Sequence, residues 1–137
     1  MSYLAFISHS SEDTWVAKKL SLECKAAGAE TFLDEAEIEV GANTDDEILA
    51  ALRNADELIV LITPWALDRR YVILEIGAAW GQGIPIIVLL LGISTSEFNE
   101  KANLPMVLKQ KNLLPLNQVD RYLGELAKRV SANGGAL

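Results

Sequence analysis

One acidic residue, Glu75, lies in an otherwise apolar stretch that runs from Tyr71 to Trp80. Every other residue of this stretch is apolar, aromatic or glycine. Removing a charged group from water is costly, so a carboxylate here needs a specific role. The alternative is that Glu75 occupies the solvated stripe of a helix. The apolar neighbours favour the first interpretation and make Glu75 a candidate site residue.

Helical spacing predicts which side of this segment faces the core. The predicted core stripe consists of residues at positions i, i+3, i+4 and i+7, namely Ile73, Ile76, Gly77 and Trp80. Glu75 points away from this stripe and shares its side with Tyr71, one turn earlier. We therefore expect the helix to be covered on both sides, by its own sheet and by a ligand or another chain.

Length and charge limit the class of protein. The chain has 137 residues, 50% hydrophobic and 23% charged, as expected for one globular domain. Its net charge of -7 argues against nucleic acid as a direct partner, because phosphate backbones require clustered lysine and arginine. The longest apolar stretch, Ile84 to Ile93, contains Pro85 and is too short to span a membrane. We expect a soluble, cytoplasmic protein.

A single cysteine and a single histidine limit the chemistry further. One cysteine excludes an internal disulfide, and one residue of each kind excludes a zinc cluster of the usual ligands. Cys24 aligns with Val16 and Leu20 on a helical stripe, which favours a core position over a nucleophile. His9 follows the first predicted strand, where a turn or capping role is favoured over general-acid chemistry. We expect no bound metal and no cofactor.

Hydrophobic periodicity alternates between strand-like and helix-like along the chain. Strands are predicted at residues 3–8, 30–34, 58–62, 84–91 and, at an edge, 113–116. Helices are predicted at residues 12–27, 44–54 and 119–130, besides the Glu75 helix and one short helix within 94–110. Ser10 with Asp13, and Thr44 with Glu47, have the spacing of capping boxes.

This alternation predicts a parallel sheet with helices on both faces. By fold-level analogy we expect a flavodoxin-like three-layer α/β sandwich, with a central parallel five-stranded sheet in the order 2-1-3-4-5. Such sheets bind ligands beyond the carboxyl ends of the strands, here between the loops at 8–11 and 63–70. We expect one domain over residues 1–131, followed by a tail or the start of a linker at 132–137.

Five segments of the chain are similar, in order and spacing, to the Toll/interleukin receptor (TIR) domain family, in its bacterial branch. They read FISHSSED from residue 6, FLD from residue 32, LITP from residue 61, EIGAAW from residue 75 and IPII from residue 84. The similarity covers roughly residues 3–130 and rests on the combination of segments rather than on any one motif.

The resemblance implies an enzyme that cleaves the nicotinamide–ribose bond of NAD+, which is its substrate and not a cofactor. In active members a glutamate on the third helix performs this step, and by position it is Glu75. In these members an aromatic residue, often tryptophan, commonly precedes the glutamate by one helical turn. In this chain that position holds Tyr71. The other substrate-binding residues that the resemblance implies are His9, Ser10, Ser11, Asp34, Gly41 and Asn43.

A single carboxylate is sufficient for this reaction. Most glycosidases need a second carboxyl group to protonate a poor leaving group. Nicotinamide leaves as a neutral ring from a positively charged one, so it needs no general acid. A preorganised carboxylate that holds the ribose and stabilises its developing charge typically contributes about 3–4 kcal/mol.

Two main classes of function follow. The first is an NAD+ nucleosidase (NADase) of prokaryotic antiphage or immune defence, activated by oligomerisation, with hydrolysis and cyclisation to an ADP-ribose-type signal both open. The second is a non-catalytic scaffold that works through TIR–TIR contacts. Both imply self-association, and a sensor or effector domain or a partner protein often accompanies short TIR chains.

Two further classes of function are less consistent with the sequence. A nucleoside deoxyribosyltransferase-like glycosidase is a more distant option, because it shares a glutamate and a similar fold. A phospho-acceptor receiver is rejected, because the third strand ends in Ile62-Thr63-Pro64 and not in an aspartate.

Overall fold

The computed structural model describes residues 2–33, 44–66, 70–101 and 113–134. Within these ranges the strands form one parallel sheet in the order β2-β1-β3-β4-β5. The strands are β1 (Leu4–Ser8), β2 (Glu30–Leu33), β3 (Glu57–Ile62), β4 (Ile86–Leu90) and β5 (Leu113–Pro115). The predicted strand order is confirmed, including the edge position of the last strand.

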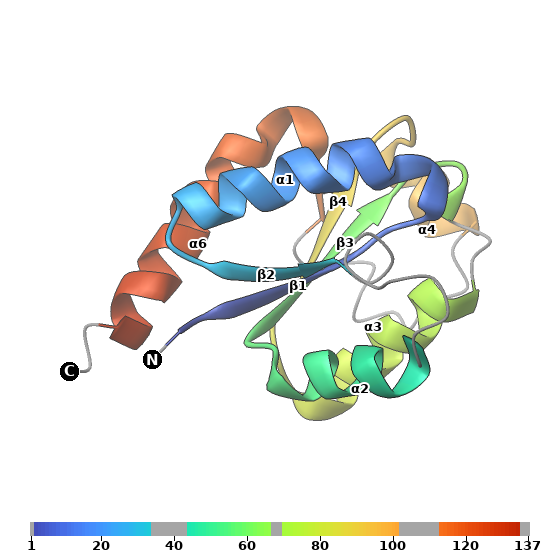
Figure 1. The fold of residues 1–137 in the computed structure, drawn as a ribbon. Coiled ribbons are helices and arrows are strands. Elements are labelled where there is room, and N and C mark those ends of the chain that lie inside the picture. Colours follow the sequence, from blue (N-terminus) through green and yellow to red (C-terminus); the bar gives the residue numbers. More distant parts are fainter. Residues whose placement is uncertain (1, 34–43, 67–69, 102–112, 135–137) are drawn as a thin grey trace.

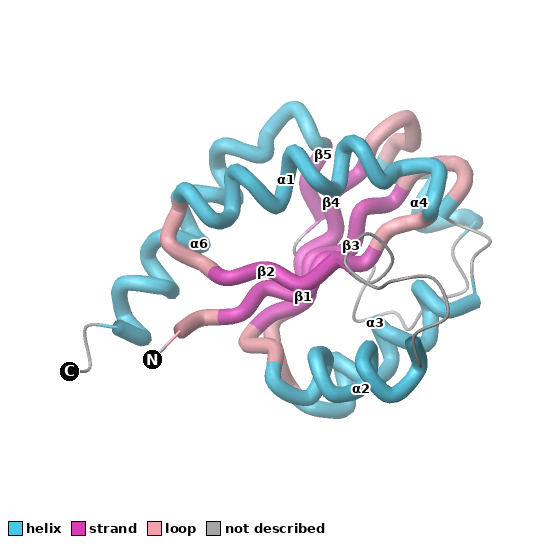
Figure 2. The backbone as a smooth tube through the Cα atoms, in the orientation of Figure 1, coloured by secondary structure: helices cyan, strands magenta, loops and turns pink. Residues whose placement is uncertain are grey.

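Helices cover both faces of the sheet, as Figure 1 and Figure 2 show. Helices α1 (Thr14–Ala26) and α6 (Val119–Gly134) lie on one face, and α2 (Thr44–Asn54) and α3 (Arg70–Gln82) lie on the other. A short helix, α4 (Thr95–Lys101), contributes Phe98 to the core under α2 and α3. The three-layer architecture is therefore as predicted. Across the residues described, no helix combines the length and apolar character needed to cross a bilayer.

Alternate residues of the central strands fill two separate cores. On β3, Leu58 and Val60 pack with residues of α2 and α3, whereas Ile59 and Leu61 pack with residues of α1 and α6. Every residue of β3 and β4 is buried. This confirms the expectation that their continuous apolar runs are strands covered on both faces.

Helix α1 ends as predicted but begins differently. Gly28 follows the helix with a φ of +103°, a conformation that glycine adopts without strain. At the other end, the predicted capping box is wrong: the Ser10 side chain makes no bond to the helix backbone and instead donates to the Asp13 carboxylate. Residues Ser11–Asp13 form a 3-10 turn, η1, before α1 starts at Thr14.

Helix α6 is longer than predicted, because it continues from Val130 to Gly134. It is preceded by a 3-10 turn, η3 (Leu116–Gln118). Tyr122 and Leu126 of this helix are buried against α1 and the sheet. The helix itself was thus predicted, although its end was not.

A buried polar cluster attaches α6 to the start of β3. The Glu57 carboxylate is fully buried and accepts hydrogen bonds from the Tyr3 hydroxyl at 2.6 Å and from the Tyr122 hydroxyl. Arg129 donates to the same carboxylate through Nε at 2.7 Å and Nη2 at 3.2 Å. Burial, reinforced by Glu57, raises the pKa of both tyrosines above their ordinary value.

The only cysteine of the chain belongs to the core between α1, α6 and the sheet. Cys24 is fully buried there, as predicted. Burial, with smaller contributions from the charges of Glu57 and Glu23, raises the pKa of its thiol to about 12. A thiol that stays protonated and enclosed is a packing residue and not a nucleophile.

Candidate active site

The carboxyl ends of β1 and β3 lie side by side at one edge of the sheet. Ser8, the last residue of β1, pairs with Val60 of β3, and Thr63 follows β3 directly. The strand that follows β1 in the chain, β2, lies on one side of this pair, and the strand that follows β3, β4, lies on the other side. Parallel sheets bind ligands at such a point, which is where the two predicted site loops begin.

The Glu75 carboxylate is buried against this edge. Glu75 is 5% exposed, and its Oε1 accepts a hydrogen bond from the Ser8 hydroxyl at 2.6 Å. Ser8 shares a strand face with Phe6, which packs in the core beneath α3. A short hydrogen bond to a carboxylate is among the stronger polar contacts in proteins, so it fixes Glu75 to the end of β1.

The predicted orientation of the Glu75 helix is wrong. Ile76 and Ala79 are the buried positions of α3, whereas Gly77 is exposed and Trp80 is 55% exposed. Glu75 therefore lies on the inward side with Ile76 and does not point away from the core. An almost entirely apolar helix gives little directional signal, and the bond to Ser8 offsets the burial of a charge that the helical wheel had placed outside.

A second buried carboxylate, Asp13, joins the two loops. Its Oδ2 accepts hydrogen bonds from the Ser10 hydroxyl at 2.6 Å and from the Thr63 hydroxyl at 2.5 Å. The Thr63 hydroxyl in turn accepts the Ala66 N–H at 3.3 Å, at the start of the segment that leads to α3. The edge of the sheet thus holds two buried acids, each bonded to serine or threonine hydroxyls from the strand ends.

His9 lies in sequence between Ser8, which bonds to Glu75, and Ser10, which bonds to Asp13, and it is buried. Its Nδ1 is 2.7 Å from the Ser10 carbonyl oxygen, which can only accept, so Nδ1 carries the proton and donates. This contact supports the predicted turn role. Ser11, by contrast, is exposed, and its hydroxyl donates to Glu12 at 3.3 Å.

The structure brings some of the predicted site residues together. Glu75, His9 and Ser10 lie buried at the carboxyl ends of β1 and β3, while Ser11 lies at the solvent side of the same loop. Tyr71 belongs to the first turn of α3, one turn before Glu75, but its side chain lies outside the described residues. The predicted wall of Asp34, Gly41 and Asn43 lies entirely outside them.

Ser8, Asp13 and Thr63 were not predicted as polar partners at this edge. For Ser8 a signal was present: strand alternation places it on the face of Phe6, under the helix that carries Glu75. For Asp13 and Thr63 the bond spans fifty residues of sequence, and only the sheet order brings them together. Within the described ranges, no group of histidine, cysteine and acidic residues is arranged to hold a metal ion.

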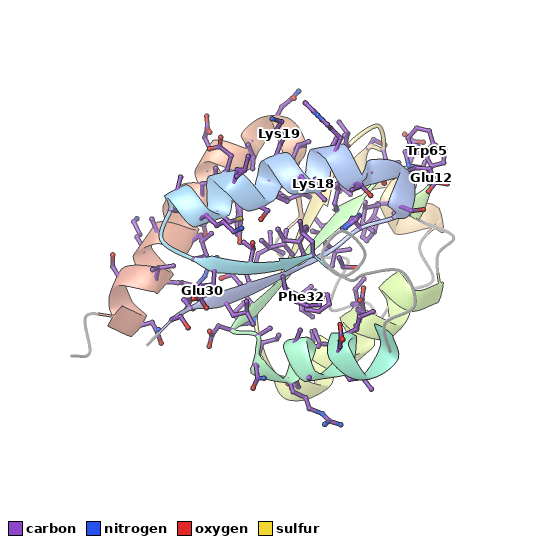
Figure 3. The ribbon with its side chains drawn as sticks, in the orientation of Figure 1. Glu12, Lys18, Lys19, Glu30, Phe32 and Trp65 are labelled. Atoms are coloured by element: carbon purple, nitrogen blue, oxygen red, sulfur yellow. The ribbon has the colours of Figure 1, made fainter. Side chains whose placement is uncertain are left out.

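All three tryptophans of the chain are exposed, including Trp80, which was predicted to lie on the core stripe of its helix. Trp15 is 70% exposed on α1, with the Lys19 ammonium 5.2 Å from its ring centroid. Trp65 is 57% exposed and, with Glu12, projects from the end of the molecule where β1 and β3 finish (Figure 3). These three rings therefore lie outside the core.

The fold and site define a class: an α/β domain with a flavodoxin-like sheet and a buried acid at its β1–β3 edge. The family model for the TIR domain matches residues 5–126 of this chain. The chain belongs to the TIR domain family. No curated protein matches its sequence significantly.

Solved structures share this fold at low sequence identity. The TIR domain of the Toll-related receptor TRR-2 from Hydra magnipapillata superposes with a TM-score of 0.66 at 21% identity, covering 90% of this chain and 97% of that one. A TIR-STING receptor from C. gigas gives 0.69 at 19%, covering 90% of this chain but 39% of the receptor. A 2-deoxyribosyltransferase from Bacillus psychrosaccharolyticus gives 0.55 at 16%, covering 77% and 95%.

Proposed function

We propose that this TIR domain is an NAD+ nucleosidase in which Glu75 is the catalytic residue. The observation that carries the proposal is the buried Glu75 carboxylate, bonded to Ser8 where sheets of this order bind ligands. Burying a carboxylate is costly, and a purely structural helix position would not require one. The resemblance to active TIR domains supplies the substrate, because their glutamate at this position cleaves NAD+.

The reaction needs only one bond to break before a nucleophile adds. The bond between the ribose C1′ and the nicotinamide nitrogen breaks, its electron pair stays on the ring nitrogen, and the pyridinium ring becomes neutral. The ribose is left as an oxocarbenium ion, whose positive charge the Glu75 carboxylate stabilises. Water then adds to C1′ and loses a proton, giving ADP-ribose; a nucleophile within the same molecule would give a cyclic product instead.

The Ser8 hydroxyl has a defined part in this scheme. By donating to Oε1 it sets the position of the Glu75 carboxylate relative to the end of β1 before substrate arrives. A group held in place in advance needs no reorganisation at the transition state, which is where such electrostatic stabilisation is most effective. Hydrogen bonds from ribose hydroxyls to Glu75 would then orient C1′.

Self-association is part of the proposal. Exposed tryptophans on α1, on α3 and on the loop after β3 offer apolar surface to a second copy of the domain. NAD+ loss or an ADP-ribose-type signal in the cytoplasm suits antiphage or immune defence, with a sensor or effector domain or partner protein controlling assembly. The same surfaces favour the second candidate, a TIR–TIR scaffold without turnover.

Incubating the purified protein with NAD+, dilute and with a crowding agent, and measuring released nicotinamide separates these two functions. We expect release that rises more than in proportion to protein concentration. Glu75→Gln should abolish it while leaving the fold intact, because the amide keeps the shape and removes the charge. Glu125→Gln, at an exposed position of α6, is the matched control and should behave as the wild type.

Each other outcome has a clear meaning. Release by a folded Glu75→Gln variant would remove Glu75 from the catalytic role. No release under any condition, combined with concentration-dependent assembly, would favour the scaffold. Release of the base from a 2′-deoxynucleoside but not from NAD+ would favour a deoxyribosyltransferase-like glycosidase.

A further inference from the structure

Asp13 stands at the position where an α-helix normally has its capping residue, but it does not cap the helix. It is the residue before α1, and its side chain makes no hydrogen bond to the helix backbone. An aspartate here would ordinarily accept an N–H of the first turn. Its carboxylate is instead turned into the protein, where Asp13 is 5% exposed.

The two donors to Asp13 come from the two loops that bound the candidate site. Ser10 follows β1 and Thr63 follows β3, and both hydroxyls donate to the same oxygen, Oδ2, at 2.6 and 2.5 Å. Hydrogen bonds of this length to a carboxylate are charge-assisted and strong. One buried oxygen therefore holds the ends of two neighbouring strands at a fixed separation.

Each of these loops leads to Glu75. Ser10 is two residues from Ser8, and the whole segment Ser8–Ser10 is fully buried. The segment is tied at one end to Glu75 through Ser8 and at the other end to Asp13 through Ser10. In the loop after β3, the Thr63 hydroxyl accepts a hydrogen bond from the Ala66 N–H. From there the chain continues to α3, which carries Glu75.

We propose that Asp13 is a positioning residue for the active site: its carboxylate locks the loops after β1 and β3 together and thereby sets the Ser8–Glu75 contact. This inference rests on the proposed catalytic function of Glu75. Asp13 acts through Ser10 and Thr63 and need not touch the substrate. Small displacements of a catalytic group are costly, so loss of the lock affects turnover more than substrate binding.

The test compares three variants in the nicotinamide-release assay. Asp13→Ala removes both hydrogen bonds, and kcat should fall on the order of a hundredfold with little change in KM. Asp13→Asn keeps an oxygen that can accept both hydroxyls, so it should recover most of the lost kcat. Ser21→Ala is the matched control, because it removes another 2.6 Å hydroxyl contact of α1, to Thr31 of β2, away from Glu75. Its kcat should be unchanged.

A second measurement does not depend on turnover. In protein labelled with 13C-glutamate, the side-chain carboxyl signal of Glu75 is identified by its loss in Glu75→Gln. Asp13→Ala should shift this signal, whereas Ser21→Ala should leave it in place. If Asp13→Ala does not fold, the variants Ser10→Ala and Thr63→Val take its place in both measurements. Each of them removes one of the two hydrogen bonds to Asp13.

The two hypotheses can fail separately. If the wild type releases no nicotinamide but the Glu75 signal moves in Asp13→Ala, the NADase function is wrong and the lock is supported. If the signal stays in place, or if kcat falls no further than in Ser21→Ala, the positioning role of Asp13 is refuted.

Discussion

At the scale of single residues, the Glu75 carboxylate depends on one hydroxyl from the end of a strand. Ser8 reaches it because β1 places even-numbered side chains on the face that α3 covers. The contact spans 67 residues of sequence, and it turns a costly buried charge into an oriented one. The position of Glu75 therefore follows from the strand as much as from its own helix.

Ser8→Ala should lower kcat for NAD+ cleavage. Loss of a hydrogen bond to a charged group costs about 1.5–3 kcal/mol, which corresponds to roughly a ten- to hundredfold decrease in rate. Single-turnover kinetics of nicotinamide release would measure it, with circular dichroism to verify the fold. A folded Ser8→Ala variant with wild-type kcat would show that the contact has no part in catalysis.

Tyr71→Ala should raise KM for NAD+ clearly while changing the stability of the fold little. Tyr71 lies one turn before Glu75 on α3, at the position where active TIR domains carry an aromatic residue. Stacking of a base on an aromatic side chain is worth about 1–3 kcal/mol, so KM should rise roughly five- to hundredfold. Tyr71→Phe retains the ring and should keep the wild-type KM. An unchanged KM in Tyr71→Ala would argue against stacking.

Sequence alone singled out Glu75 as an unusual residue but did not predict its surroundings. A carboxylate in an apolar stretch is visible in the sequence, because burying a charge is exceptional. The direction in which it points was not visible, since nearly every side of α3 is apolar and the inward residues Ile76 and Ala79 resemble the exposed Ala78. Strand alternation places Ser8 on the face of Phe6, but the bond between Thr63 and Asp13 depends on a contact distant in sequence, which local patterns do not encode.

At the scale of elements, α6 is held to the sheet by the Glu57 cluster as well as by apolar packing. Tyr122 and Arg129, both on α6, bond to a single carboxylate at the start of β3. For Arg129, burial alone would lower the pKa of the guanidinium, but the hydrogen bond and charge of Glu57 together raise it. The cluster is at the amino end of β3, opposite the end that carries Thr63.

Arg129→Met should destabilise the fold and leave nicotinamide release per folded molecule unchanged. Removing one partner of a buried ion pair leaves an uncompensated charge; Arg129 is 31% exposed, so we expect about 2 kcal/mol, below the fully buried range. Urea unfolding measures this loss. Arg121→Met, at an exposed position of the same helix, is the control and should cost little. Equal stability of the two variants would show that the cluster does not secure α6.

The elements themselves were largely predictable, and the exceptions have physical causes. Strand β4 starts at Ile86 and not at Ile84, because Pro85 has no N–H to donate to the ladder. Strand β3 starts one residue earlier than predicted, at Glu57. A charged residue at this position favours a loop in the sequence, but in the structure its carboxylate is bonded to Tyr3, Tyr122 and Arg129. Burial patterns locate strand centres well, but long-range polar contacts set several of the ends.

At the scale of the whole molecule, the two cores differ in their ionisable groups. The core between the sheet, α2 and α3 is formed by apolar side chains, with the Glu75 carboxylate buried at its edge. The core between the sheet, α1 and α6 includes Tyr3, Cys24 and Tyr122, each with a pKa raised mainly by burial. All three are neutral when protonated, so the folded state favours their protonated forms.

The free energy of unfolding should therefore fall in alkaline solution. As the pH rises, the unfolded chain loses the Cys24 proton from about 9.0, whereas the folded thiol keeps it to about 12, so unfolding releases a proton and stability decreases across this window. Tyr3 and Tyr122 add to the decrease above their ordinary value of 10.0. Each proton contributes up to about 1.4 kcal/mol per pH unit.

Urea unfolding at several pH values between 8 and 11 measures this slope, on the order of one to three protons. Cys24→Ala separates the thiol from the tyrosines. Its absolute stability is lower because of the cavity, but its slope between pH 9 and 11 should be shallower than that of the wild type by up to one proton, since only the wild type has the thiol. Tyr3 and Tyr122 contribute equally to the slopes of both proteins as the pH approaches and passes 10.0. Equal slopes between pH 9 and 11 would mean that the buried thiol ionises as easily in the folded protein as in the unfolded chain.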